Sequence, residues 1–180
     1  KLLIALAERA DLILDFTNVP AGNYVLGNVG PDEPLGGGVP NVDFDAADSN
    51  STGQVMEFRV GPALAPDPTT PPRFLGLPII EPLPAESLTR RLALLEKGEV
   101  FPEIGFDGPV EALLGTVDSN GNALEKRWED EVSENPVVGD TEVWEFFNFT
   151  ADAHPMHIHE IAFEVVNREG LVLDAESEEP

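Results

Sequence analysis

The sequence of 180 residues contains no cysteine. Disulfide bonds are therefore excluded, and so is any metal site whose thiolate ligand comes from these residues alone. Long apolar runs are also missing, because none approaches the roughly twenty residues that a membrane-spanning helix needs. We therefore expect neither a disulfide scaffold nor a membrane segment.

Basic residues are scarce as well. Ten lysines and arginines stand against thirty-four acidic residues, which gives a formal net charge of −24, and only three of the ten are lysines. A field of this sign repels nucleic acid and anionic lipid, so we expect neither nucleic acid nor a membrane as a partner. It attracts cations, including metal ions and cationic organic substrates. The composition suits a protein kept soluble in high salt, or an ordinary acidic secreted protein.

The amino-acid composition disfavours long helices. Seventeen prolines and sixteen glycines are spread along the chain, and proline removes a helix donor and clashes with the preceding turn. Short apolar and alternating runs instead predict an all-β chain. The strands are expected over residues 2–6, 10–16, 24–28, 54–60, 89–95, 110–117, 123–128, 141–149 and 157–167. Aromatic residues on both faces of 141–149 predict a strand buried on both sides.

A proline-rich stretch divides the chain. It predicts a connector without regular secondary structure, and we place a linker at residues 63–86 between one domain at 1–62 and another at 87–180. Within the second domain, the pair Asn120-Gly121 predicts a hairpin turn, because both residue types tolerate a positive φ.

All three histidines of the chain lie in one run of six residues, His154-Pro155-Met156-His157-Ile158-His159. Imidazole is a common metal ligand that suits copper, zinc, iron and nickel. In extended backbone, side chains two apart share a face, so His157 and His159 point the same way and His154 points to the other side. This geometry predicts a bridge between two metal centres, which suits electron transfer. The alternative is a histidine-rich strand end that binds no metal.

This run resembles the third copper motif of the multicopper oxidases, the group of laccases, bilirubin oxidases and spore-coat oxidases. The residues before it, Gly139 to Glu145 and Asn148 to Thr150, share the resemblance. Residues 7–16 and 52–60 resemble the second cupredoxin domain of that family, and residues 89–94 resemble the first strand of its third domain. The resemblance covers most of the chain in the order in which the family has these segments.

The resemblance implies cupredoxin-like Greek-key β-sandwiches, with part of a second domain at 1–62 and part of a third at 87–180. It implies copper as the cofactor, bound by His154 in a mononuclear blue site and by His157 and His159 in a trinuclear cluster. The implied activity couples one-electron oxidation of phenolic, tetrapyrrole or metal-ion substrates to reduction of O₂ to water. The implied location is secreted, periplasmic or at the cell surface.

The chain departs from the family pattern in two ways. It has one of the four histidine motifs that the family uses, and it has no cysteine for the blue site. It therefore carries only part of the copper sites, and we expect it to associate with the remaining oxidase segments or with a second copy of itself. The alternative is a metal-binding fragment without catalytic activity.

Three acidic residues near the run have two interpretations each. Asp140 and Asp152 are expected to cap turns, and the alternative is that they hold an imidazole in one tautomer. Glu160 is expected to be a solvated carboxylate at a strand end, and the alternative is a proton relay near the copper cluster.

Overall fold

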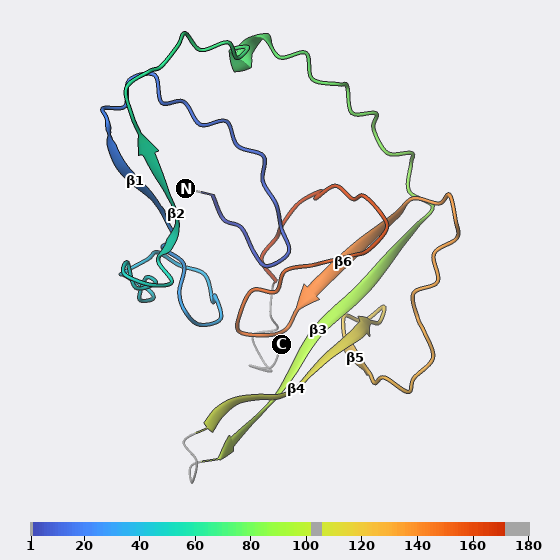
Figure 1. The fold of residues 1–180 in the computed structure, drawn as a ribbon. Coiled ribbons are helices and arrows are strands. Elements are labelled where there is room, and N and C mark those ends of the chain that lie inside the picture. Colours follow the sequence, from blue (N-terminus) through green and yellow to red (C-terminus); the bar gives the residue numbers. More distant parts are fainter. Residues whose placement is uncertain (1, 102–105, 172–180) are drawn as a thin grey trace. The chain divides into compact units, whose positions relative to one another are not determined.

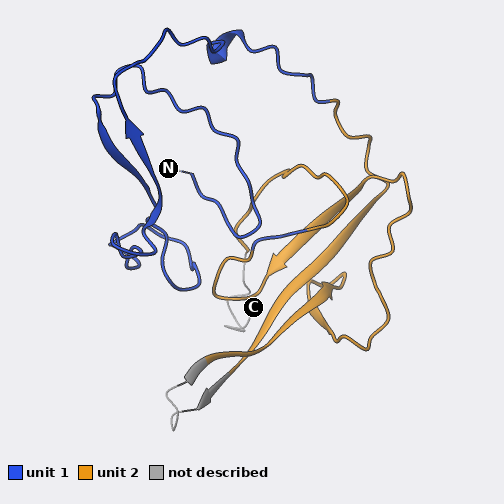
Figure 2. Ribbon diagram, in the orientation of Figure 1, with its two compact units in different colours: residues 1–80, 155–157 blue, residues 81–154, 158–180 orange. Residues whose placement is uncertain are grey.

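The computed structural model describes residues 2–101 and 106–171. The chain divides into two units, residues 1–80 with 155–157 and residues 81–154 with 158–180 (Figure 2). Six strands and one 3₁₀ turn, η1 (Pro72–Phe74), make up the regular structure of the described part, so the all-β prediction is confirmed. No described helix is long and apolar enough to cross a membrane. The predicted domain limits stay a prediction, and residues 172–180 of the second lie outside the described residues.

The first unit is built on one antiparallel strand pair. Strand β1 (Gly22–Gly27) pairs with β2 (Gln54–Val60), with Gly22 opposite Val60 (Figure 1). The ring centroids of Phe16 and Phe58 lie 5.5 Å apart. Phe58 and Val60 are half-buried while Met56 is 51% exposed, so the face of β2 that carries these three apolar residues is only partly covered.

The second unit is a four-stranded sheet with the order β5-β4-β3-β6. Strand β3 (Leu88–Phe101) lies between β4 (Phe106–Val117), which is antiparallel to it, and β6 (Glu142–Asn148), which is parallel. Strand β5 (Ala123–Lys126) pairs with β4. The buried apolar residues in the described part of this unit are Val117 on β4 and three residues of β3, where Ala93 is fully buried between Leu92 and Leu94. Strand β3 has a neighbouring strand on each edge, so its residues are shielded from solvent.

A turn joins β4 and β5 where the sequence predicts one, but of the pair Asn120-Gly121 only the glycine has a positive φ. Gly121 has φ 93°, a left-handed conformation that glycine adopts without strain. The Asp118 carboxylate accepts hydrogen bonds from the backbone N–H of Asn120 at 2.8 Å and of Asn122 at 2.9 Å. The hydrogen bond from the Asn122 side chain, followed by these backbone bonds, lowers the pKa of Asp118. The longer pairing of β3 with β4, out to Phe101 opposite Phe106, was not predicted.

Three predicted strands are wrong. Residues 2–6, 10–16 and 157–167 belong to no strand of the described chain. A strand is defined by hydrogen bonds to a neighbour, and no described segment supplies that neighbour here. The strand expected at 141–149 does form as β6, but it lies at an edge of the sheet and its residues are mostly half-buried rather than buried.

Candidate metal centre

The parallel pairing of β3 with β6 brings His154 close to a residue far away in sequence. Asn148 at the end of β6 lies opposite Leu94, and the Phe149 N–H donates to the Leu94 carbonyl at 3.0 Å. Because the two strands run in the same direction, the residues after Asn148 pass the part of β3 that follows Leu94. Glu96 lies in that part of β3, 58 positions before His154 in the sequence.

A ring of short hydrogen bonds shapes the turn between β6 and His154. The Asn148 Oδ1 atom accepts from the Thr150 N–H at 3.1 Å and lies 2.7 Å from the Thr150 hydroxyl. The Asn148 Nδ2 atom donates to the Asp152 carbonyl at 2.7 Å. The Thr150 hydroxyl oxygen lies 2.6 Å from His154 Nε2. Every one of these groups is half-buried, so the turn holds the imidazole against the end of the sheet.

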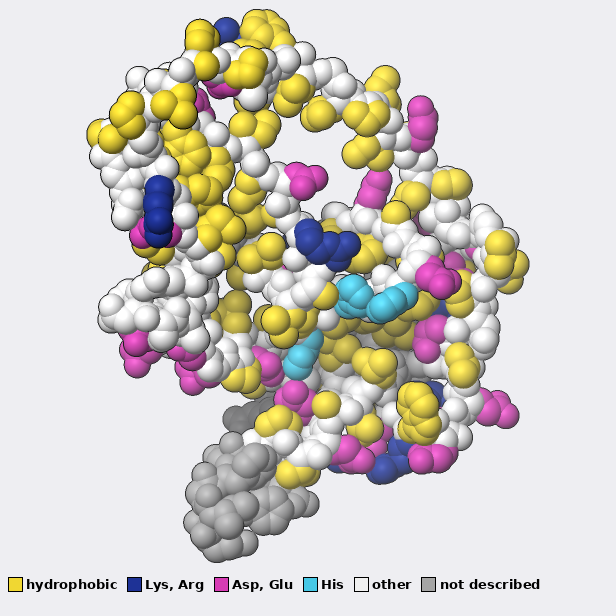
Figure 3. All heavy atoms as spheres, viewed as in Figure 1, with side chains coloured by type: hydrophobic (Ala, Val, Ile, Leu, Met, Phe, Trp, Pro, Cys, Tyr) yellow, Lys and Arg dark blue, Asp and Glu magenta, His cyan; other side chains and the backbone are white. Residues whose placement is uncertain are grey.

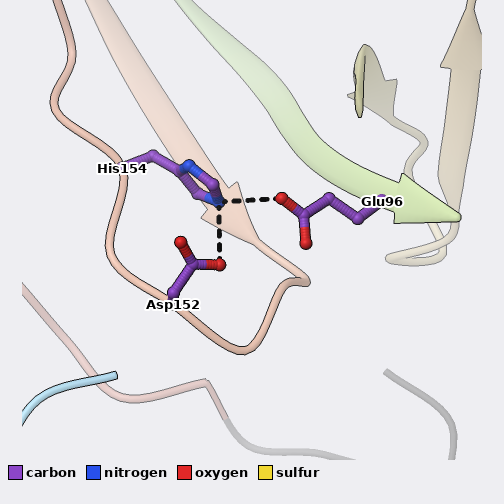
Figure 4. A group of neighbouring side chains, drawn as sticks. All are labelled: Glu96, Asp152 and His154. Atoms are coloured by element: carbon purple, nitrogen blue, oxygen red, sulfur yellow. Dashed lines mark ion pairs between the residues drawn. The ribbon is translucent and has the colours of Figure 1, made fainter. Parts of the chain in front are cut away.

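Two carboxylates face the same imidazole nitrogen (Figure 4). His154 Nε2 lies 3.6 Å from Asp152 Oδ1 and 3.7 Å from Glu96 Oε1, and the three side chains are between 22% and 28% exposed. Their ligand atoms all lie within 4.8 Å of one another. Within the described residues neither carboxylate forms an ion pair with a lysine or arginine, since the neighbouring Lys97 contacts Glu111 and Glu125 instead. The cluster therefore has a negative character.

The cluster differs from the sequence-based expectation at Asp152, and it includes Glu96, which the sequence did not predict. Asp152 was expected to cap a turn, but its carboxylate lies 3.6 Å from His154 Nε2, near the imidazole and not hydrogen-bonded to it, so its role in holding the tautomer stays a prediction. Its backbone carbonyl, not its side chain, accepts the hydrogen bonds of the turn. Sequence analysis missed Glu96, because its approach to His154 depends on strand pairing and no local motif marks it. Asp140 closes a turn through its backbone N–H, which donates to the Val137 carbonyl at 3.0 Å.

The other two histidines lie further along the run. His157 groups with the first unit, while His154 and His159 group with the second. Exposure alternates from Asp152 to His159, with His154 half-buried and His157 and His159 exposed, which is the parity expected of extended backbone. The assignment of the three residues to two copper sites stays a prediction. Glu160, which follows them, has φ 64°, an uncommon left-handed conformation for this residue type.

The donor set suits copper in part. Imidazole nitrogen is a good copper ligand, whereas the carboxylate oxygens of Glu96 and Asp152 suit harder cations such as Mn²⁺. A blue copper site also needs a thiolate, and the chain has no cysteine. The histidines therefore fit copper as a portion of a ligand set, and the remaining ligands would have to come from other residues than these.

Comparison with known proteins gives a consistent result. The model of the multicopper oxidase family matches residues 109–179. Multicopper oxidase LPR1 homolog 1 of Oryza sativa subsp. japonica is 33% identical over 171 residues, which is 95% of this chain and 26% of that protein. The laccase of Bacillus subtilis (strain 168) is 32% identical over 92% of this chain and 27% of its own length. A bilirubin oxidase of Albifimbria verrucaria is 27% identical over 93% of this chain and 25% of its own length.

The chain thus spans about a quarter of the length of the curated relatives it matches. No solved structure matches it at a significant level.

Proposed function

We propose that the chain belongs to the multicopper oxidase family and supplies histidine ligands to the copper sites of an oxidase that passes electrons from a reductant to O₂. The observation that carries this proposal is the histidine run itself. All three histidines of the chain lie at 154–159, inside the segment that matches the family. In that role His154 is a ligand of the copper that receives substrate electrons, and His157 and His159 are ligands of the oxygen-reducing cluster.

Bound copper would supply the redox chemistry, by taking up and releasing electrons one at a time. The protein's own residues would set the position of the imidazoles and the charge around them. Asn148 and Thr150 fix the turn that holds His154. Glu96 and Asp152 place negative charge within 3.7 Å of His154 Nε2.

The charge around His154 supports a preference among reductants. The reductants that the family resemblance implies are phenols, tetrapyrroles and metal ions. We propose that cationic reductants, and divalent metal ions in particular, are favoured at His154, since two carboxylates face the imidazole there without a lysine or arginine partner among the described residues. Acidic side chains are also spread over the visible surface (Figure 3), and they raise the local concentration of cations.

The experiment that tests the proposal is copper loading of the full chain. Copper content after dialysis is measured by elemental analysis, and the ligands are identified from nitrogen couplings in the electron paramagnetic resonance spectrum. The matched control is the triple variant H154A/H157A/H159A, which leaves all 34 acidic residues in place. We expect nitrogen-ligated copper in the wild type and its loss in the variant. Equal copper binding by both proteins would mean adventitious binding to carboxylates and would overturn the proposal.

One alternative function is favoured by a specific observation. The absence of cysteine means that the chain by itself cannot complete a blue copper site, so copper binding without turnover is the second candidate. Oxygen uptake by the copper-loaded protein with a reductant separates the two. Oxygen uptake together with an intense blue absorbance supports the oxidase. A pale complex that consumes no oxygen supports copper binding alone.

We further propose that the protein acts outside the cytoplasm, as a secreted, periplasmic or cell-surface protein, and that it works together with further oxidase segments or a second copy of itself. The support for the location is the family resemblance only. Fractionation of the source cells, followed by detection with an antibody against the chain, tests it.

A further inference from the structure

We infer that Thr150 and Asn148 are positioning residues that fix the tautomer of His154, with the proton on Nε2 and the lone pair on Nδ1. The basis is the 2.6 Å contact between the Thr150 hydroxyl and His154 Nε2, together with the other partners of that hydroxyl. The consequence, that copper is bound through Nδ1, rests on the proposed function. The proton assignment itself does not depend on copper.

The orientation of the Asn148 amide is fixed first. A backbone N–H can only donate, so the atom that lies 3.1 Å from the Thr150 N–H must be the amide oxygen. A backbone carbonyl can only accept, so the atom that lies 2.7 Å from the Asp152 carbonyl must be the amide nitrogen. Both contacts require the same orientation, and Oδ1 therefore faces Thr150.

The single hydroxyl proton of Thr150 is assigned next. The hydroxyl oxygen has two oxygen neighbours that can only accept, Asn148 Oδ1 at 2.7 Å and the Asp152 carbonyl at 3.1 Å. Its proton lies on one of these two contacts, because an oxygen pair at 2.7 Å without a proton between the atoms is repulsive. The hydroxyl then has only lone pairs to offer to His154. The nitrogen at 2.6 Å must therefore be the donor, so Nε2 carries the proton.

The carboxylates of the cluster act in the same direction. Asp152 Oδ1 at 3.6 Å and Glu96 Oε1 at 3.7 Å place negative potential at Nε2, which favours an N–H at this nitrogen over a lone pair. Figure 4 shows both carboxylates on the Nε2 side of the ring and the second nitrogen on the other side. Within the described residues, the hydrogen bond of His154 and its two contacts with carboxylates are all made by Nε2. In a neutral imidazole with a proton on Nε2, Nδ1 is the nitrogen that can bind a metal.

The sheet gives this arrangement its rigidity. Asn148 is the last residue of β6, and the next N–H, that of Phe149, is bonded to β3 at Leu94. The tautomer is thus set by a turn that is attached to the four-stranded sheet at its start. A ligand with a fixed proton and a fixed ring orientation needs less ordering when metal binds.

The test is nitrogen NMR of the full chain labelled with ¹⁵N, recorded without metal. Long-range correlations from the ring protons identify the protonated nitrogen of each histidine, and the variants H157Q and H159Q assign the three spin systems. We expect His154 to be protonated on Nε2 and to show an N–H proton that exchanges slowly with water. A lone pair on Nε2 in the wild-type spectrum would overturn the inference, with no variant needed.

Two substitutions separate the hydroxyl from general packing. In T150V the Nε2 proton should exchange faster by up to about tenfold, since one hydrogen bond is lost. T150S keeps the hydroxyl and should restore slow exchange. If T150V leaves the exchange rate unchanged, Thr150 does not hold the proton and the inference is wrong.

Titration with Cu(I), which keeps the spectrum diamagnetic, distinguishes failure of the inference from failure of the proposed function. We expect the Nδ1 resonance of His154 to shift while the Nε2 proton remains. Loss of that proton, with copper bound at Nε2, would overturn the inference. No change at His154 at saturating Cu(I) would remove His154 from the copper site and contradict the proposed function, while the proton assignment would stand on the metal-free spectrum.

Discussion

At the scale of single residues, the side chain of Glu142 is 7% exposed and accepts hydrogen bonds from two neighbours. Arg90 binds both of its oxygens, at 2.7 and 2.9 Å, and Trp144 Nε1 donates to one of them at 2.8 Å. The bonds from Arg90, followed by that from Trp144, lower the pKa of Glu142 from its usual 4.5. The ionised form is therefore favoured more in the folded state than in the unfolded one.

This lowered pKa predicts a loss of stability in acid. A depressed folded-state pKa adds stability above the unfolded value near 4.5, and this is lost as the pH falls through the folded value. We expect E142Q to be less stable than the wild type at neutral pH, with a difference that shrinks below pH 4.5. Urea unfolding across this range measures it, with E145Q, on the exposed face of the same strand, as the control. A difference that does not vary with pH would contradict the linkage.

The carboxylates beside His154 give a second prediction at this scale. In the oxygen-consuming protein, E96Q and D152N should lower kcat/KM for a divalent metal-ion reductant on the order of tenfold, because each removes negative charge near the electron-entry imidazole. A neutral phenol should be affected much less. E129Q removes the same charge from an exposed position, and it should leave both reductants unchanged. Equal losses with both reductants would contradict a role in selecting cations.

Some residues of the site can be predicted from the sequence and others cannot, and the difference has a physical reason. The histidines were found because their spacing is local and their chemistry is specific. Asp152 lies two positions before His154, so the sequence showed the pair but could not tell a turn cap from an imidazole neighbour. Glu96 could not be found, because its position follows from the parallel β3–β6 register and that pairing has no local sequence signal.

At the scale of elements, the same distinction separates the strands that were predicted from those that were not. The β4–β5 hairpin carries its own turn chemistry in Asp118 and Gly121, so its pairing could be predicted. The segment 157–167 alternates well, but a strand also needs a neighbour, and the described chain provides none there. Periodicity predicts which residues can form a strand, whereas pairing depends on the rest of the sheet.

Gly115 provides a prediction about the centre of the sheet. It lies on β4 opposite Ala93 of β3 and Glu125 of β5. A Cβ atom at this position would lie 2.5 Å from the Leu124 carbonyl oxygen and 3.2 Å from Leu95 Cδ1, so the β4–β5 backbone would have to separate. We expect G115A to destabilise the protein by roughly 1–3 kcal/mol, as overpacking does.

Urea unfolding followed by circular dichroism measures this effect. The control is G170A, because a Cβ atom at Gly170 meets nothing within 4 Å. The control should unfold close to the wild-type midpoint. If G115A and G170A unfold at the same urea concentration, the close approach of β5 to β4 is not a constraint on the fold.

At the scale of the whole molecule, apolar residues remain exposed along a segment with strand-like alternation. Ile161, Phe163 and Val165 are 60%, 52% and 58% exposed, and all three have the same parity in the chain. Within the described residues they belong to no strand. An extended apolar segment of this kind can pair with a strand edge of another polypeptide, which buries both its side chains and its backbone groups.

We therefore expect the purified chain to associate as its concentration is raised, with residues 161–166 at the contact. Sedimentation velocity measures the association, and amide hydrogen exchange should show protection of 161–166 that increases with concentration. The triple variant I161S/F163S/V165S should remain monomeric at concentrations where the wild type associates. The control V132S/V137S/V138S removes the same number of exposed apolar residues from another loop and should associate as the wild type does. Equal behaviour of the two triples would mean that association is unspecific, and a monomeric wild type at every concentration would contradict the prediction outright.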